Sequence, residues 1–113
     1  MDYVRNLIHC GGPASCGITG KGVGVAVLDT GIFPHIDFED RIAGFYDAVS
    51  HRRAPYDDNG HGTHIAAIIG GNGRQSGGKY AGIAPGSHMI AVKVLDSSGN
   101  GYASDVLAGL SWI

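Results

Sequence analysis

Residues 58–71 have the sequence Asp-Asn-Gly-His-Gly-Thr-His-Ile-Ala-Ala-Ile-Ile-Gly-Gly, in which a polar, glycine-spaced turn passes directly into an apolar stretch. The apolar stretch predicts a helix over residues 61–69. His61 then lies in the first turn of the helix, where backbone N–H groups have no helical partner. Gly60 and Gly62 place no bulk beside the ring, which leaves room for another chain to approach the imidazole closely.

The composition is that of an ordinary globular chain and argues against several classes of function. Apolar residues make up 43% and charged residues 16% of the 113 residues, which is not the composition of a disordered chain. The net charge of −2 gives no support for a nucleic-acid partner. There is no apolar run of about 18 residues, so we expect no membrane partner. The 20 glycines lie in short clusters that indicate tight turns.

The first residues of the chain carry no recognisable targeting signal. Residues 1–6 are mixed and polar, so a natural start at Met1 predicts a cytoplasmic protein, whereas a secreted protein is expected if Met1 is not the natural start. Residues 3–10 predict a short helix. Cys10 and Cys16 form neither a CxxC motif nor a disulfide framework, and we interpret them as reduced thiols.

Two apolar runs predict parallel strands, and an aspartate ends each run. Residues 23–28 are typical of a parallel strand that is buried on both faces, and Asp29 follows them. Residues 88–95 precede Asp96, and residues 41–47 predict a short edge strand. A carboxylate at a buried strand end is costly without a partner, and open α/β sheets bind ligands at this edge. Asp29 is therefore a candidate site residue; alternatively, it caps local N–H groups in a turn.

The remaining segments complete an α/β pattern. Residues 70–78 predict a flexible, glycine-rich loop, and Ser104 is the expected N-cap of a second helix. The order β, loop, α, β, α predicts a parallel sheet with a right-handed crossover. The chain ends at Trp112 and Ile113 inside the helical pattern, so we expect it to be the front part of a longer domain.

Asp29 at a strand end and His61 at the following helix start are expected to meet above the sheet. An aspartate that accepts a hydrogen bond from an imidazole N–H fixes the tautomer and stabilises the imidazolium. The other ring nitrogen is then free to take a proton from a nucleophile. The helix N-terminus disfavours the charged ring and the carboxylate favours it, a balance suited to a base near neutral pH. The pair therefore predicts acid–base catalysis with a serine or cysteine nucleophile.

Four segments occur in the order found in one known family. They are Val-Ala-Val-Leu-Asp-Thr-Gly-Ile at 25–32, Asp-Asn-Gly-His-Gly-Thr-His-Ile-Ala-Ala at 58–67, Gly-Ile-Ala-Pro-Gly at 82–86 and Ala-Val-Lys-Val-Leu at 91–95. Together they resemble the subtilisin-like serine proteases (peptidase family S8), whose triad follows the chain order Asp, His, Ser. The resemblance implies a three-layer α/β subtilisin-like fold with a parallel sheet, present only in part. Residues 1–113 are then the N-terminal part of the catalytic domain, truncated before the nucleophile.

The resemblance also implies roles for individual residues. Asp29 is the triad aspartate and His61 the general base, while His64 is a second, non-catalytic histidine that is buried one turn further on. The family's Gly-Thr-Ser nucleophile motif is absent from the sequence. We therefore expect a serine endopeptidase of the subtilisin type whose first 113 residues are inactive by themselves.

Gly99, Asn100 and Gly101 match the family segment whose backbone pairs with polypeptide substrates in extended conformation. The alternative for these residues is an ordinary turn. A pro-segment is a further partner that the resemblance implies. A non-catalytic half-domain or pseudoprotease that binds extended peptides is the alternative function. The missing serine favours that alternative, and the intact Asp29 and His61 argue against it.

Metal chemistry receives less support. His61 and His64 could bind a metal together with Asp29, Asp57 and Asp58, but a zinc helix of the HExxH kind needs a four-residue step and a glutamate. We therefore expect no metal at the site and no cofactor for the chemistry.

Structural calcium is doubtful for a similar reason. Asp37 matches a family position that can bind calcium. The partner loop over residues 70–80 offers two cations and no carboxylate, which is poor chemistry for a hard cation.

Overall fold

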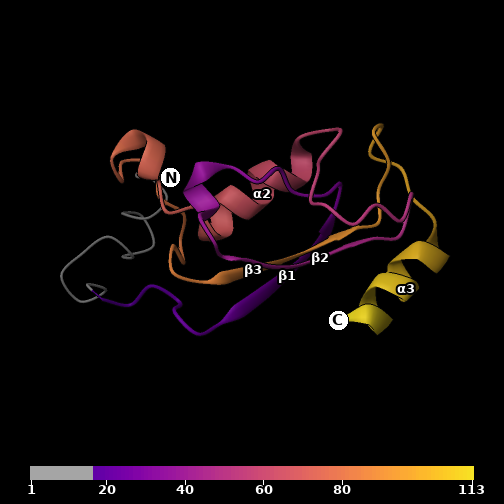
Figure 1. Ribbon diagram of the computed structural model, residues 1–113, viewed down its shortest axis with the longest axis horizontal. Helices are drawn as coiled ribbons and strands as arrows, with labels where there is room; N and C mark the ends of the chain where they lie inside the picture. Colours follow the sequence, from indigo (N-terminus) through magenta and orange to yellow (C-terminus); the bar gives the residue numbers. More distant parts are fainter. Residues whose placement is uncertain (1–16) are drawn as a thin grey trace.

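The computed structural model describes residues 17–113 as a three-stranded parallel sheet with a helix on each face (Figure 1). The strands β1 (Gly24–Asp29), β2 (Ile42–Asp47) and β3 (His88–Lys93) lie in the order β1-β3-β2. The three predicted strands and the edge position of β2 in this sheet are confirmed. The helix predicted for residues 3–10 and both cysteines lie outside the described residues.

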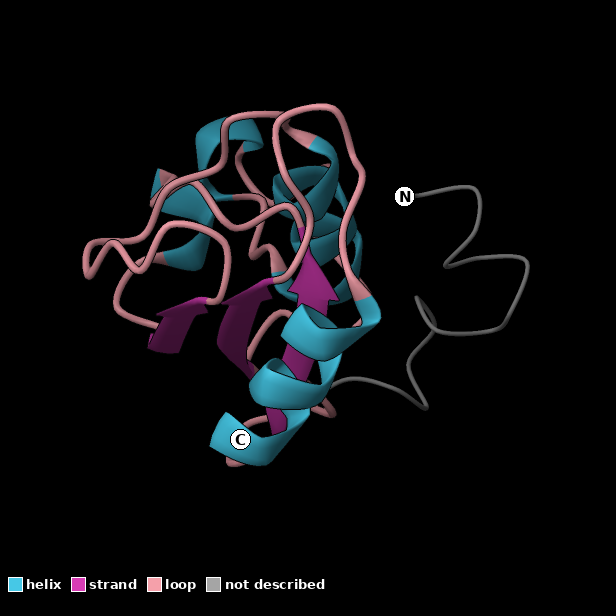
Figure 2. Cartoon of the chain, turned by 90° about the vertical axis from the view of Figure 1, so that its right-hand side faces the viewer, coloured by secondary structure: helices cyan, strands magenta, loops and turns pink. Residues whose placement is uncertain are grey.

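Two helices form the outer layers of the fold. Helix α2 (His61–Gly70) connects β2 to β3, and helix α3 (Ala103–Trp112) follows β3. The two helices lie on opposite sides of the strands, with α3 in front of them in Figure 2. This arrangement agrees with the expected partial three-layer α/β fold. No described helix is long and apolar enough to cross a membrane.

The sequence of α2 explains both its start and its orientation. Gly60, with φ of 103°, turns the chain into the helix, and the Asn59 side-chain oxygen accepts a hydrogen bond from the His61 N–H at 3.0 Å. The buried positions of the helix are Gly62, Ala66 and Gly70, which are four residues apart and therefore lie on one face. Small residues on this face allow α2 to pack directly against the sheet and the turn after β1.

Helix α2 comes closest to the turn after β1 at Gly62, which packs against the backbone of Thr30 and Gly31. A Cβ atom at Gly62 would lie 2.3 Å from the carbonyl oxygen of Gly31 and 3.1 Å from the nitrogen of Thr30. Only glycine fits this contact. It fixes the start of α2, and therefore His61, against the carboxyl end of β1.

The core is divided between the two faces of the sheet. The cluster under α2 contains Ile32, Phe38, Ala66, Met89 and Ala91. The cluster on the α3 face contains Ala48, Val92 and Val94, with Val106 of α3 packed against it. The central strand β3 contributes side chains to both clusters because alternate residues point to opposite faces.

Two expectations about local structure are wrong, namely the burial of β1 on both faces and the N-cap of α3. Gly24 and Ala26 of β1 are exposed, because β1 lies at the edge of the described sheet and is not buried on both faces. The N-cap of α3 is Tyr102 rather than Ser104, and it makes no side-chain cap hydrogen bond. The loop over residues 70–78 contains a short 3₁₀ helix, η3 (Arg74–Ser76), whose Gln75 N–H donates to Asp37 at 2.9 Å.

The close approach at Gly62 predicts a specific stability defect. Gly62→Ala should lower the free energy of unfolding by about 2 kcal/mol, because the new methyl group meets rigid backbone rather than a movable side chain. Urea unfolding measures the change. Ser104→Ala is the control and should cost less than about 0.5 kcal/mol, since Ser104 is exposed and does not cap α3. A Gly62→Ala protein as stable as the control would contradict the packing argument.

Candidate active site

The structure brings Asp29 and His61 together at the carboxyl edge of the sheet. Nδ1 of His61 lies 2.8 Å and 2.9 Å from the two carboxylate oxygens of Asp29. Asp29 also accepts a hydrogen bond from the Thr30 N–H at 2.7 Å. The Asp29 side chain is only 12% exposed, whereas that of His61 is 60% exposed. The buried carboxylate therefore holds one edge of an imidazole whose remaining surface is accessible.

Asp57 organises the turn that delivers His61, and sequence analysis missed this role. Its carboxylate accepts hydrogen bonds from the N–H groups of Asn59, Gly60 and Thr63 and from the hydroxyl groups of Thr30 and Thr63. The Thr30 hydroxyl in turn accepts from the Gly62 N–H at 2.9 Å. The turn after β1 and the first turn of α2 are thus joined through one carboxylate.

These hydrogen bonds also determine the charge state of Asp57. Burial by itself would raise the pKa of the carboxyl group. The donors from Thr63, Gly60 and Asn59 outweigh burial and hold the pKa well below its usual value of 3.8. Asp57 is therefore a permanent anion near the N-terminus of α2, where negative charge is favourable.

A second buried carboxylate, Asp47 at the end of β2, anchors the loop on the far side of the site. It accepts from the N–H groups of Val49, Ser50 and Arg52 and from the Tyr56 hydroxyl at 2.5 Å. Burial opposes ionisation of Asp47, but these donors lower its pKa overall. Burial and the neighbouring Asp47 raise the pKa of Tyr56 to about 12, so the phenol stays protonated and remains a donor.

The predicted substrate segment lies beside His61. Gly99 lines one pocket together with Thr30, Asn59, His61 and Leu95. Asn100 and Gly101 line a neighbouring pocket. The segment is exposed, and its turn is held by hydrogen bonds to Asp96 from the N–H groups of Gly99 and Asn100.

The proximity of Gly99 to His61 is the geometry that the substrate-binding prediction requires. In residues 17–113, the backbone of Gly101 forms no hydrogen bond. Its N–H and C=O groups are therefore available for pairing with another strand.

Lys93 is the second residue that sequence analysis missed. It is 1% exposed at the end of β3, and its ammonium group donates to Asp58 at 2.7 Å. In the sequence, Lys93 lies inside the apolar run 88–95, so a charge at the end of that run points to Asp96 instead, whereas β3 ends at Lys93. No comparable pattern marks Asp57, because turn aspartates are common.

His64 does not occupy the buried position that was expected. It is exposed, because the buried face of α2 is formed by Gly62, Ala66 and Gly70, and His64 points away from that face.

The aspartates that a metal at His61 and His64 would need are engaged in other hydrogen bonds. Asp57 accepts from backbone amides and Asp58 from Lys93. Within residues 17–113, no group of three or more metal-ligating side chains is present.

The Asp37 region does not suit a calcium ion. The Asp37 carboxylate already accepts a hydrogen bond from the Gln75 N–H. The facing loop contributes the guanidinium group of Arg74, which lies 3.2 Å from Glu39, and the Asn72 side-chain amide, which donates to Glu39. Donor groups therefore occupy the side on which a hard cation would need oxygen ligands.

Comparison with known proteins points to one family. The model of the subtilase family, peptidase S8, matches residues 20–113. A serine protease from Bacillus subtilis, AprX, is 53% identical over 95 residues, which are 84% of this chain and 22% of AprX. Subtilisin Savinase from Lederbergia lenta is 45% identical over 96 residues, which are 85% of this chain and 34% of that protein.

A solved structure shows the same fold. The crystal structure of a cold-adapted subtilisin-like serine proteinase superimposes with a TM-score of 0.74 at 38% identity, over 85% of this chain and 33% of that one. The present chain thus spans about a fifth to a third of the length of these proteins.

The hydrogen bonds to Asp57 predict acid sensitivity. Its lowered folded-state pKa stabilises the fold above about pH 4, and this contribution is lost as the pH falls below 3.8 towards the folded-state pKa. Asp57→Asn should lower the free energy of unfolding by about 2 kcal/mol near neutral pH and should flatten the decline in stability in acid. Urea unfolding at about pH 7 and about pH 3 measures both effects.

Asp40→Asn is the matched control, because Asp40 is exposed. It should change neither the stability near neutral pH nor the slope in acid. An Asp57→Asn protein that declines in acid as steeply as the Asp40→Asn protein would show that Asp57 does not carry the effect.

Proposed function

Because the chain belongs to the subtilase family, we propose that its residues supply the acid–base pair and part of the substrate-binding surface of a subtilisin-type serine endopeptidase. The observation that carries the proposal is the contact of His61 Nδ1 with both oxygens of buried Asp29. The orientation leaves the other ring nitrogen of His61 free of the carboxylate.

The mechanism follows from this geometry. A serine Oγ attacks the carbonyl carbon of the scissile peptide bond while the free ring nitrogen of His61 takes the serine proton. Asp29 keeps the proton of the imidazole on Nδ1 and stabilises the imidazolium that forms. His61 then gives its proton to the leaving amine. Water repeats the sequence on the acyl-enzyme and releases the second product.

We place the nucleophile outside residues 1–113, because the serine motif of the family is absent from the sequence. Residues 1–113 are then the N-terminal part of the catalytic domain, and they are inactive alone. The substrates are polypeptides in extended conformation that pair with Gly99, Asn100 and Gly101. Exposure of this segment beside His61 supports the proposal.

The decisive experiment uses the longer protein that carries these residues and the downstream serine. His61→Ala and Asp29→Asn should each lower kcat for peptide hydrolysis by about 10³-fold or more, since each removes part of general-base catalysis. Steady-state hydrolysis of an extended peptide measures the loss, and inactivation by a sulfonyl fluoride reports the serine.

His88→Ala is the matched control, because His88 is an exposed histidine at the start of β3. It should leave kcat within about twofold of the wild type. Retention of activity in His61→Ala would exclude the proposed mechanism. Binding of an extended peptide without cleavage by the wild type would instead favour a pseudoprotease.

A further inference from the structure

We propose that Lys93 is a positioning residue that holds the loop over residues 95–101, which ends in the substrate segment Gly99–Gly101, in a fixed place relative to the Asp29–His61 pair. The proposal rests on the function proposed above. It assigns to a buried cation the task of setting the distance between the peptide-binding backbone and the base.

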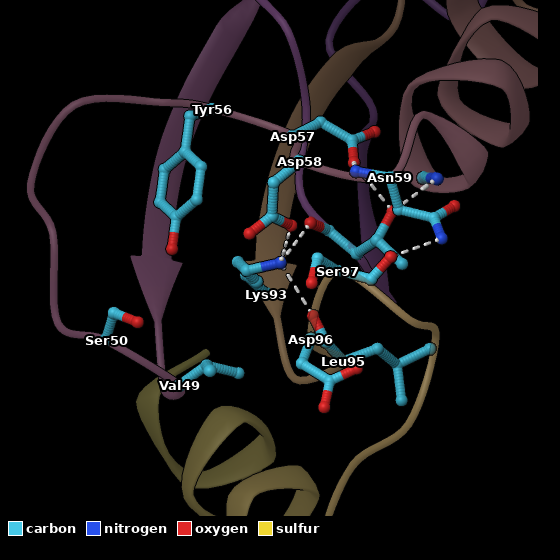
Figure 3. Close-up of polar contacts among 12 residues, drawn as sticks. Val49, Ser50, Tyr56, Asp57, Asp58, Asn59, Lys93, Leu95, Asp96 and Ser97 are labelled. Atoms are coloured by element: carbon cyan, nitrogen blue, oxygen red, sulfur yellow. Dashed lines mark hydrogen bonds and ion pairs between the residues drawn. The ribbon is translucent and has the colours of Figure 1, made fainter.

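The ammonium group of Lys93 is fully satisfied by three oxygens. It donates to the carbonyl oxygens of Thr30 and Leu95 and to Oδ1 of Asp58, each at 2.7 Å. An ammonium group has three N–H donors, so each donor has an acceptor. The ring of Tyr56 lies 5.3 Å from the nitrogen, which adds a favourable cation–π contact. Figure 3 shows Lys93 between Asp58 and Leu95.

Each acceptor belongs to a different part of the site. Thr30 follows Asp29 directly, and Asp58 lies in the turn that leads to His61. Leu95 begins the loop that ends in the substrate segment. One nitrogen atom therefore joins the aspartate of the pair, the approach to the histidine and the peptide-binding backbone.

Asn59 makes a second connection between the same parts. Its side-chain nitrogen donates to the carbonyl oxygen of Ser97 at 2.9 Å (Figure 3). Its side-chain oxygen accepts from the His61 N–H at 3.0 Å. The backbone of His61 is thus one side chain away from the substrate segment. Asn59 lines the pocket that contains His61 and Gly99, as do Thr30 and Leu95, whose carbonyl oxygens accept from Lys93.

Burial makes the Lys93 contact stiff. Lys93 is 1% exposed, so a shift of the substrate segment would leave a buried cation short of an acceptor. The surface pair between Arg74 and Glu39 differs, with side chains 62% and 39% exposed, and such pairs contribute little. An apolar side chain could also fill the end of a strand. Unlike an apolar side chain, the Lys93 ammonium makes directed hydrogen bonds that fix the position of Leu95 relative to Thr30 and Asp58.

The consequence concerns substrates of different length. An extended peptide paired with Gly99–Gly101 presents its scissile carbonyl at a distance from His61 that this contact fixes. A misplacement of about 1 Å can cost about 100-fold in rate. A single-residue ester does not reach the segment, so its hydrolysis does not depend on where the segment lies.

The test compares both substrates in three variants of the longer, serine-containing protein. Lys93→Met removes the ammonium with little change in volume, and Asp58→Ala removes its half-exposed partner. Both should lower kcat/KM for an extended peptide by about 10- to 100-fold and leave that for a single-residue ester within about twofold. Lys21→Met, an exposed lysine, is the matched control and should change neither.

A parallel fall for both substrates would show that Lys93 acts on the Asp29–His61 pair or on overall stability rather than on the substrate segment, and would overturn the proposal. An unchanged rate for the peptide would also overturn it. If Lys93→Met fails to fold, the kinetics of Asp58→Ala decide the question.

If the wild type cleaves neither substrate, the proposed function has failed, and hydrogen exchange tests the positioning role by itself. The amides of Asp96, Gly99 and Asn100 should then exchange about tenfold faster in Asp58→Ala than in Lys21→Met. Equal exchange would refute the positioning role.

Discussion

Three buried charges at the ends of three neighbouring strands determine how the loops of this protein are arranged. Asp29, Lys93 and Asp47 are the last residues of β1, β3 and β2, and they pair in register across the sheet. As whole residues, each is at most 9% exposed, so each needs a partner that the sheet itself does not supply. The following loops provide these partners: His61 for Asp29, Asp58 and two carbonyl groups for Lys93, and Tyr56 with three amides for Asp47.

The opposite end of the sheet is stabilised without reactive groups. Arg41, just before β2, is 9% exposed and donates to the carbonyl oxygens of Gly70 at the end of α2, Ser87 and Asp37. These acceptors are backbone groups, including a carbonyl that α2 leaves unpaired at its C-terminus. The Arg41 guanidinium therefore stabilises this end of the sheet through hydrogen bonds to backbone alone. The carboxyl edge, by contrast, carries the side-chain contact between Asp29 and His61.

The parts of the fold that could be predicted from the sequence are those governed by local patterns. Apolar runs located the strands, and the charge at the end of one run identified Asp29, which led to His61. The same rule does not reach Lys93, because the apolar run continues to Leu95 while β3 ends two residues earlier. The expected burial of His64 was wrong, because it depends on which face of α2 meets the sheet. The expected capping role of Ser104 was wrong because α3 begins one residue earlier, at Ala103. Nothing local distinguishes Asp57, whose partners Thr30 and Thr63 come from separate elements.

The ionisable groups around His61 at the carboxyl edge of the sheet keep one charge state near neutral pH. The hydrogen bonds to Asp57 and Asp47 lower the pKa of each carboxyl group, so both remain ionised near neutral pH. Tyr56, whose pKa is raised to about 12, stays protonated and keeps donating to Asp47. Asp57, Asp47 and Tyr56 therefore act as fixed charges and dipoles around His61. Fixed dipoles need no rearrangement when charge develops in a transition state. In the proposed mechanism, the turn that carries His61 is therefore held by groups whose charge stays constant during proton transfer.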